Sequence, residues 1–220
     1  MDSIKSEGAR WCTNAALIQC VERLSVEVAA GEFSGLERIF TERSLTPPVI
    51  QLDPHPNALP SAQHRLLLEY WRAKRSVNGL MPRNKLDPID LHTLLGNLML
   101  LEASPDGFDF IYRVYGTKIA EHAQKDWTGL TIGRMCELVD SRVGVFYRAI
   151  YAASALIHRP IFTEHSAPPS IGASAWQRLI VPLSDAAGNA RFFLATNYPV
   201  RFHAVDKELN SAYVARLGAS

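Results

Sequence analysis

The stretch LMLLEASPDGFDFIYRVYGT, residues 98–117, contains two apolar runs separated by a four-residue joint. The runs are Leu98–Ala103 and Phe108–Tyr115, and both are rich in residue types that favour strands. The joint, Ser104-Pro105-Asp106-Gly107, combines the residues that form tight turns. The stretch therefore predicts an antiparallel β-hairpin.

Downstream of the hairpin, helices and then further strands are predicted. Residues 116–138 break into short helices and turns, and residues 140–158 carry apolar side chains at mostly helical spacing before Pro160. Three strand-like runs follow at 161–165, 176–183 and 190–197, and a polar helical tail begins at about residue 205. The order β-β-α-α-α-β-β-β indicates an α+β fold with a five-stranded antiparallel sheet.

Upstream of the hairpin, the pattern is mostly helical. Residues 61–77 predict a helix capped by Ser61, and Asp87-Pro88 opens another short one. Residues 46–60 hold five of the 13 prolines and predict an extended linker, with a short helix near 36–40 before it. Residues 11–30 predict an amphipathic helix with four apolar residues on one face: Leu17, Val21, Leu24 and Val28.

Composition restricts the classes of function. The chain has 23 Lys+Arg against 22 Asp+Glu, so its net charge of +1 offers no field that attracts nucleic acid. Cys12, Cys20 and Cys136 lack the paired spacing of a disulfide framework or a cysteine zinc site. The sequence has no apolar run of about 18 residues and no signal peptide pattern. We therefore expect a cytoplasmic protein that does not bind membranes.

Five separated motifs occur in order along about residues 65–198. They are Leu68-Glu69-Tyr70-Trp71-Arg72 with Pro82-Arg83, Leu86-Asp87-Pro88-Ile89-Asp90-Leu91 leading to Leu94-Leu95, Tyr112-Arg113-Val114-Tyr115-Gly116-Thr117, Asp126-Trp127-Thr128-Gly129, and Leu179-Ile180-Val181-Pro182-Leu183-Ser184. Together they resemble a bacterial family of small, poorly characterised PAS-like proteins. At two positions the chain departs from the family pattern: Gly96 stands in place of the expected proline and Gln124 in place of glycine.

The resemblance implies a PAS-like fold, in which a curved five-stranded antiparallel sheet is covered on one face by helices. We expect residues 1–60 to form an N-terminal helical extension and linker, 61–204 the PAS-like sensory domain, and 205–220 a tail. The space between sheet and helices is then the expected ligand pocket, either open or filled by the core. Its predicted lining is Met99, Tyr112, Phe146, Ile150, Phe162, Leu179, Val181 and Phe193.

Two kinds of polar residue are candidates for ligand or cofactor binding. Arg113 stands inside an apolar strand and could clamp an anion in the ligand site, because a guanidinium binds a carboxylate or phosphate through two hydrogen bonds. The alternative for Arg113 is a salt bridge to Asp126 or Glu121. His158 and His122 are haem-ligand candidates, although a histidine at a helix end more often offsets the helix dipole. The sequence therefore leaves the cofactor unknown.

Catalytic signals are weak. The sequence contains no nucleophile-elbow, zinc-protease, P-loop or dinucleotide motif, and Cys136 lacks the surroundings of a flavin-reactive cysteine. Asp87 and Asp90 are expected to cap a helix start, and Glu164 and His165 point to opposite faces of a strand. We expect no enzymatic activity.

The sequence favours a signalling input module, in which a small ligand or a protein contact shifts packing between sheet and helices. The N-terminal helices would pass the shift to a separate effector protein, through a homodimer formed by helix 11–30. The alternatives are a ligand-free protein-interaction scaffold of the same fold and, third, a small α+β enzyme with a polar cleft.

Overall fold

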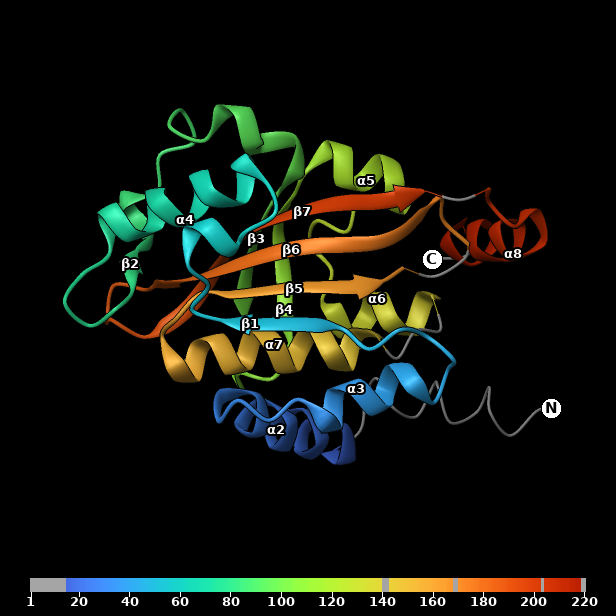
Figure 1. Ribbon diagram of the computed structural model, residues 1–220, viewed down its shortest axis with the longest axis horizontal. Coiled ribbons are helices and arrows are strands. Elements are labelled where there is room, and N and C mark those ends of the chain that lie inside the picture. The colour runs from blue at the N-terminus through green and yellow to red at the C-terminus, as the bar shows by residue number, and fades with distance from the viewer. Residues whose placement is uncertain (1–14, 140–142, 168–169, 203, 219–220) are drawn as a thin grey trace.

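A computed structural model describes residues 15–139, 143–167, 170–202 and 204–218 (Figure 1). Its strands form one seven-stranded sheet in the order β1-β5-β6-β7-β3-β4, and β2 pairs with the end of β6. All neighbouring pairs are antiparallel except β2 and β6. The strands are β1 Val49–Leu52, β2 Met81–Pro82, β3 Leu98–Ala103, β4 Phe110–Tyr115, β5 Ile161–Ser166, β6 Ala173–Ser184 and β7 Ala190–Phe202.

The α+β class and the predicted hairpin are confirmed. The five predicted strands are β3 to β7, and Gly107 takes a positive φ of 77° in the β3–β4 turn, as glycine readily does. The proline-rich stretch 46–60 is extended but is not a free linker, because β1 pairs with β5 from Val49–Glu164 to Leu52–Ile161. Prolines can flank β1 because it is an edge strand.

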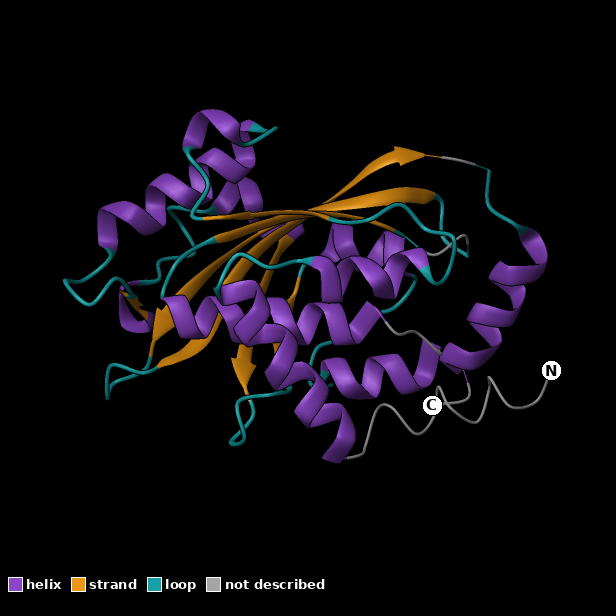
Figure 2. Cartoon of the chain, turned by 60° about the horizontal axis from the view of Figure 1, so that its bottom comes forward, coloured by secondary structure: helices purple, strands orange, loops and turns teal. Residues whose placement is uncertain are grey.

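Helices lie on both sides of the sheet, as Figure 2 shows. We expected them on one face only. The central strands have apolar side chains on both faces, so a second helical layer is needed to exclude water. The helices are α2 Ala15–Ala29, α3 Ser34–Thr41, α4 Ala62–Lys74, α5 Thr117–Ala123, α6 Ile132–Val139, α7 Val143–Ile157 and α8 Lys207–Gly218, with 3₁₀ turns η1 Pro56–Ala58, η2 Arg83–Lys85 and η3 His92–Asn97.

The alternation of side chains along β6 separates two hydrophobic cores. Ile180 belongs to the core under α7, which we call the α7 face, whereas Leu179 belongs to the core under α4, the α4 face. On the α4 face, Trp71 donates its indole N–H to the carbonyl of Pro182 at 2.7 Å. The predicted cap of α4 is confirmed, since the Ser61 hydroxyl accepts the backbone N–H of His64.

The N-terminal helix α2 packs against α7 of the same chain, and α3 follows beside it (Figure 1). All four residues of its predicted apolar face, Leu17, Val21, Leu24 and Val28, are buried. The face expected to pair two copies is therefore occupied within one chain, and the homodimer stays a prediction. Residues 11–14 of the predicted helix lie outside the described ranges.

Two local features differ from, or add to, what the sequence indicates. Asp87-Pro88 does not open an α-helix: the Asp87 carboxylate accepts the N–H of Ile89 in a turn, and η3 begins only at residue 92. Helices α6 and α7 approach closely at Gly144, where an added Cβ would lie 1.8 Å from the Cys136 sulfur. This glycine therefore lets α7 pack closely against α6.

Candidate functional site

A small chamber of about 80 Å³, partly open to solvent, lies on the α7 face of the sheet, beneath α5, α6 and α7. Helix α8 contributes one wall through Tyr213, whose hydroxyl donates to the Ala123 carbonyl at 2.7 Å. Trp127 and Trp176 provide aromatic lining. The polar lining comes from Tyr112, Tyr115, Tyr147, Arg178, Asn197 and Tyr213.

Arg178 is the central polar residue of the chamber. It lies in the middle of β6 and only 4% of its surface is exposed. Its Nε donates to the amide oxygen of Asn197 at 3.3 Å, and its guanidinium lies 4.0 Å from the centre of the Tyr147 ring. Its Nη1 is buried without a hydrogen-bond partner. No carboxylate of a described residue lies within ion-pair distance of it.

The phenols around Arg178 keep their protons. Burial raises the pKa of Tyr151 to about 12 and also raises the pKa of Tyr112, Tyr115 and Tyr147. Burial by itself would lower the pKa of Arg178. The neighbouring phenols raise this pKa by more than burial lowers it, so the guanidinium stays a cation. The Tyr151 hydroxyl is near enough to contribute to this effect, yet it has no hydrogen-bond partner of acceptable geometry.

His165 and Thr163 extend the polar cluster along β5. His165 Nε2 lies 2.7 Å from the Tyr147 hydroxyl, and its Nδ1 is buried without a partner. Burial, followed by the charge of Arg178, lowers the pKa of His165 well below its usual value, so the imidazole is neutral. Thr163 pairs with Arg178 across the strands, and its hydroxyl also lacks a partner. Glu164 points away from this cluster and accepts from Gln177, as the strand alternation predicted.

The structure divides the predicted pocket lining between the two faces of the sheet. Met99, Tyr112, Phe146, Ile150 and Phe193 belong to the α7-face core, but among them only Tyr112 lines the chamber. The other three predicted residues, Phe162, Leu179 and Val181, lie on the α4 face. Strand periodicity predicts which residues share a face, but the second helical layer was not anticipated.

Arg113 is not an anion clamp in the interior. Its side chain is 46% exposed and donates to Glu102 at 2.8 Å, so Arg113 forms a salt bridge, but its partner is neither of the expected residues, Asp126 and Glu121. A register shift between Leu100 and Leu101 disturbs the β3–β4 pairing beside it. Arg178 was missed, although its position in phase with apolar Trp176 and Ile180 is a signal of burial.

The other candidates lie outside the chamber lining. His158 ends α7 with a φ of 53° and contacts the Asn78 carbonyl, and His122 packs near the Trp176 and Phe202 rings. Cys136 is buried on α6. Within the described ranges, no three His, Cys, Asp or Glu side chains gather in a way that could hold a metal ion. These positions do not support the hypothesis that His158 or His122 binds haem.

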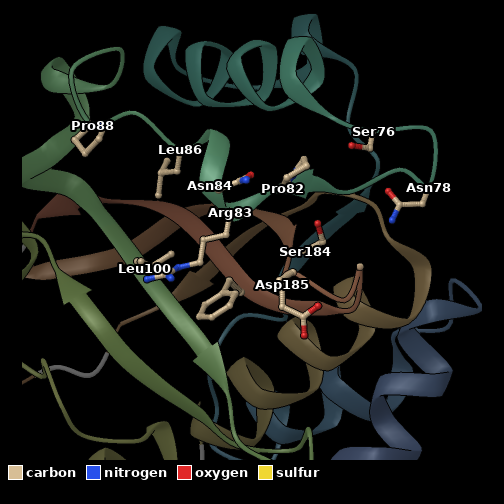
Figure 3. Close-up of a pocket in the computed structure, with 13 residues that line it drawn as sticks. Ser76, Asn78, Pro82, Arg83, Asn84, Leu86, Pro88, Leu100, Ser184 and Asp185 are labelled. Carbon is tan, nitrogen blue, oxygen red and sulfur yellow. The ribbon is translucent and has the colours of Figure 1, made fainter.

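A larger groove of about 640 Å³ lies at the surface, between the 76–88 segment and the β6–β7 turn (Figure 3). Several of its polar groups are already engaged. The Asp185 carboxylate accepts the N–H groups of Ala187 and Asn189, and the Asn78 side chain accepts that of Leu80. Arg83 lies 4.4 Å from the centre of the Phe192 ring. The hydrogen bonds of Asp185 and Asn78 are therefore those of ordinary turns.

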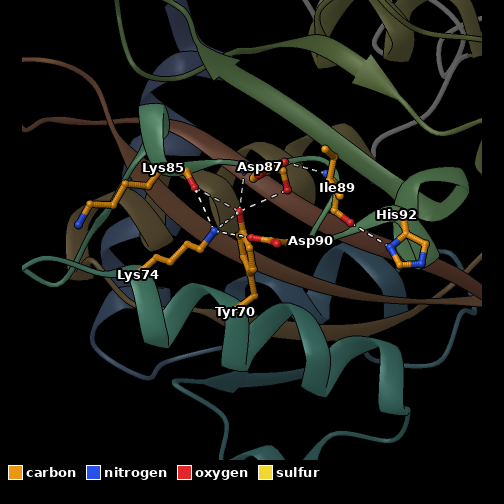
Figure 4. Close-up of polar contacts among 7 residues, drawn as sticks. All are labelled: Tyr70, Lys74, Lys85, Asp87, Ile89, Asp90 and His92. Carbon is orange, nitrogen blue, oxygen red and sulfur yellow. Dashed lines mark hydrogen bonds and ion pairs between the residues drawn. The ribbon is translucent and has the colours of Figure 1, made fainter.

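One wall of this groove is held to α4 by a compact set of polar contacts (Figure 4). The Tyr70 hydroxyl accepts the N–H of Asp87 at 2.7 Å, and Lys74 donates to the Asp90 carboxylate at 2.6 Å. That hydrogen bond with Asp90 raises the pKa of Lys74. Asp87 and Asp90 thus have structural contacts, but in a turn and an ion pair and not as the expected caps of a helix start.

One comparison with known proteins, the match to a family model, agrees with the observed fold. None of the helices in the described ranges has both the length and the apolar character needed to cross a bilayer. The chain matches no curated protein and no solved structure. The sequence model of the family described as the PAS domain matches residues 59–196, well over half of the chain. On this match, together with the antiparallel sheet and its helical cover, the chain belongs to the PAS domain family.

Proposed function

We propose that this protein is a sensory module that binds a small molecule in the chamber and does not act as an enzyme. Membership of the PAS family supports a sensory or interaction role in general. The observation that carries the finer proposal is a cluster of buried polar atoms without partners on the α7 face, of which Arg178 Nη1 belongs to a residue that lines the chamber and the other three belong to side chains outside its lining. The four atoms are Arg178 Nη1, Tyr151 Oη, Thr163 Oγ1 and His165 Nδ1.

Unpaired buried polar atoms are expensive and rare in folded proteins. Each one costs about 1–3 kcal/mol of stability, so four at one place favour a site that a bound molecule completes. The protonation states support binding over catalysis, since the pKa of Tyr151 is raised to about 12 and that of His165 is lowered. Neither group is suited to exchange protons near neutral pH.

A route for the signal runs through α7. Tyr147 lines the chamber from α7, and α2 packs against the same helix. A ligand that binds two arrangements of α7 with different affinity shifts the position of α2. The exposed side of α2, which includes Val26, is then the surface read by a separate effector protein or by a second copy of the chain.

The small volume of the chamber favours a second candidate, a scaffold whose interior is closed and which binds proteins at its surface. Thermal unfolding with a set of small metabolites distinguishes the two. A sensor gains about 5–10 °C in Tm at a ligand concentration about 100-fold above Kd.

The variant Tyr151→Phe should reduce the gain, because it removes one of the unpartnered hydroxyls. Tyr198→Phe is the matched control, since Tyr198 lies beside His64 on the α4 face. The sensor proposal is wrong if no compound changes Tm, or if both variants respond like the unmodified protein.

A further inference from the structure

We infer that the ligand of the chamber is a small carboxylate whose oxygens are bound by Arg178. The inference rests on the proposed function and adds the chemical class of the ligand. It is carried by the charge, the hydrogen-bonding balance and the volume of the chamber, each of which points to the same class.

Among the described residues, no negative charge balances that of Arg178. Arg178 is a buried cation whose Nε donates to the neutral amide of Asn197. The described residues that line the chamber include no aspartate or glutamate. A buried charge is normally paired, because removing it from water is otherwise costly. A ligand with one negative charge would supply the missing partner.

The hydrogen-bonding balance also favours an acceptor. If the Tyr147 hydroxyl donates to His165 Nε2, then the Nδ1–H of the neutral imidazole has no acceptor. In the other tautomer, Nε2–H donates to the Tyr147 oxygen, the Tyr147 proton is left free and Nδ1 becomes an unpaired acceptor. In both tautomers the Nη1 group of Arg178, which can only donate, lacks an acceptor, and the unpartnered Tyr151 hydroxyl can donate as well. A carboxylate accepts at two oxygens, and a guanidinium binds it with two parallel hydrogen bonds.

The volume limits the ligand to a few atoms. The chamber measures about 80 Å³, and a protein cavity of about 150 Å³ accommodates benzene. Scaled from the six non-hydrogen atoms of benzene, this volume holds a ligand with on the order of three to five non-hydrogen atoms. Trp127, Trp176 and Ile171 provide an apolar wall for a short carbon chain. A single cation also matches the charge of a carboxylate better than the charge of about −2 on a phosphate.

The test uses pairs of compounds that have the same shape and differ in charge. Thermal unfolding and calorimetric titration of the full chain are measured with propionate, propionamide and inorganic phosphate, at fixed pH and ionic strength. We expect saturable binding of propionate with a rise in Tm, and no comparable effect of propionamide or phosphate. Acetate with acetamide, and lactate with lactamide, extend the comparison in chain length and polarity.

Two arginine variants locate the site. In Arg178→Met the affinity for propionate should fall at least about 30-fold, because the buried partner of the carboxylate is gone. Arg113→Met is the matched control, since Arg113 is an exposed arginine paired with Glu102, and it should leave binding unchanged. If Arg178→Met does not fold, Arg178→Lys retains the charge but loses the two-pronged contact, and it should weaken propionate binding while leaving any amide binding unchanged.

Each outcome decides between the inference and the proposed function. Equal responses to propionate and propionamide, or a response to phosphate alone, would overturn the carboxylate inference while the chamber stays a ligand site. Binding only of neutral compounds from the wider metabolite set has the same meaning. Retention of propionate binding in Arg178→Met also overturns the inference. If no compound binds, both the inference and the proposed function fail.

Discussion

The two faces of the central sheet are built from alternate residues of the same strands, yet they differ in how their polar atoms are bound. On the α4 face, the Trp71 indole and His64 Nδ1 both have partners, and among the described residues of this face His64 Nε2 alone is buried without one. On the α7 face, four buried polar atoms of described residues lack partners, and no described carboxylate lies within ion-pair distance of Arg178. Large apolar side chains fill the first face, whereas the second keeps a chamber.

The difference indicates a division of roles between the faces. The α4 face has the completed contacts of a structural core, which hold the sheet and α4 together. The α7 face leaves polar groups unsatisfied at the place where Arg178 lies, which lowers stability and is typical of functional sites. The chamber and the outer groove differ in the same way. The groove is larger, but several of its polar groups are already engaged in turns.

The largest expected effect belongs to the α4 face. Trp71→Ala should lower the free energy of unfolding by about 3–5 kcal/mol, because a fully buried ring is removed and the Pro182 carbonyl loses its donor. Leu66→Ala, an exposed position on the same helix, should change it by less than about 0.5 kcal/mol. Urea unfolding measures both. Similar losses in the two variants would contradict a structural role specific to this face.

Acid should weaken both faces through their histidines. Burial lowers the pKa of His64 to about 4, and burial with Arg178 lowers that of His165 further from its usual value. The unfolded chain binds protons near pH 6.5, so stability is complete above that pH. It falls as the pH decreases, by up to about 1.4 kcal/mol per unit for each histidine, and the His64 contribution ends at about pH 4.

Unfolding of His64→Gln by urea, between pH 7.5 and pH 4.5, separates the two contributions. The variant should lose one of them and retain that of His165. In Arg178→Met the pKa of His165 should rise, because the positive charge that helps to lower it is removed. The free energy of unfolding of this variant should therefore depend less steeply on pH. An unchanged slope in both variants would show that other groups control acid stability.

On the α7 face, removing a polar group should increase stability. Arg178→Met without ligand should raise the free energy of unfolding by about 1–3 kcal/mol, because an unpaired buried charge is replaced by an apolar chain. Arg113→Met should change it by less than about 0.5 kcal/mol. Denaturant unfolding tests the sign. A clear loss of stability in Arg178→Met would mean that the guanidinium is a structural tie and that the faces do not differ in this way.

The smallest expected effect concerns the end of α5, the helix that borders the chamber. Gln124 has a φ of 58°, a left-handed conformation that glycine adopts at lower cost. Gln124→Gly should therefore stabilise the protein by about 0.5–1 kcal/mol. Glu121→Gly, inside the same helix, should destabilise it by about the same amount. If both glycines destabilise, the conformation of Gln124 carries no strain.

Gln124 also shows how sequence and structure inform each other. The family pattern predicted glycine at this position, and the left-handed backbone provides the physical reason for that preference. The face of α2, the cap at Ser61 and the boundaries of β3 were likewise predictable, since each depends on neighbours along the chain or on a regular period. The edge strand β1 was not, because an extended proline-rich segment looks the same whether or not a partner strand lies beside it.

The sequence by itself determined the elements, their order and the family, because these follow from local turn chemistry, side-chain periodicity and a set of ordered motifs. Only the tertiary structure decided that helices cover both faces of the sheet, and that Arg178 is buried while Arg113 reaches solvent. The physical reason is that burial of a charge depends on what packs over its strand. That packing involves α5, α6, α7 and α8, which are far from Arg178 in the chain and meet it only when the fold is complete.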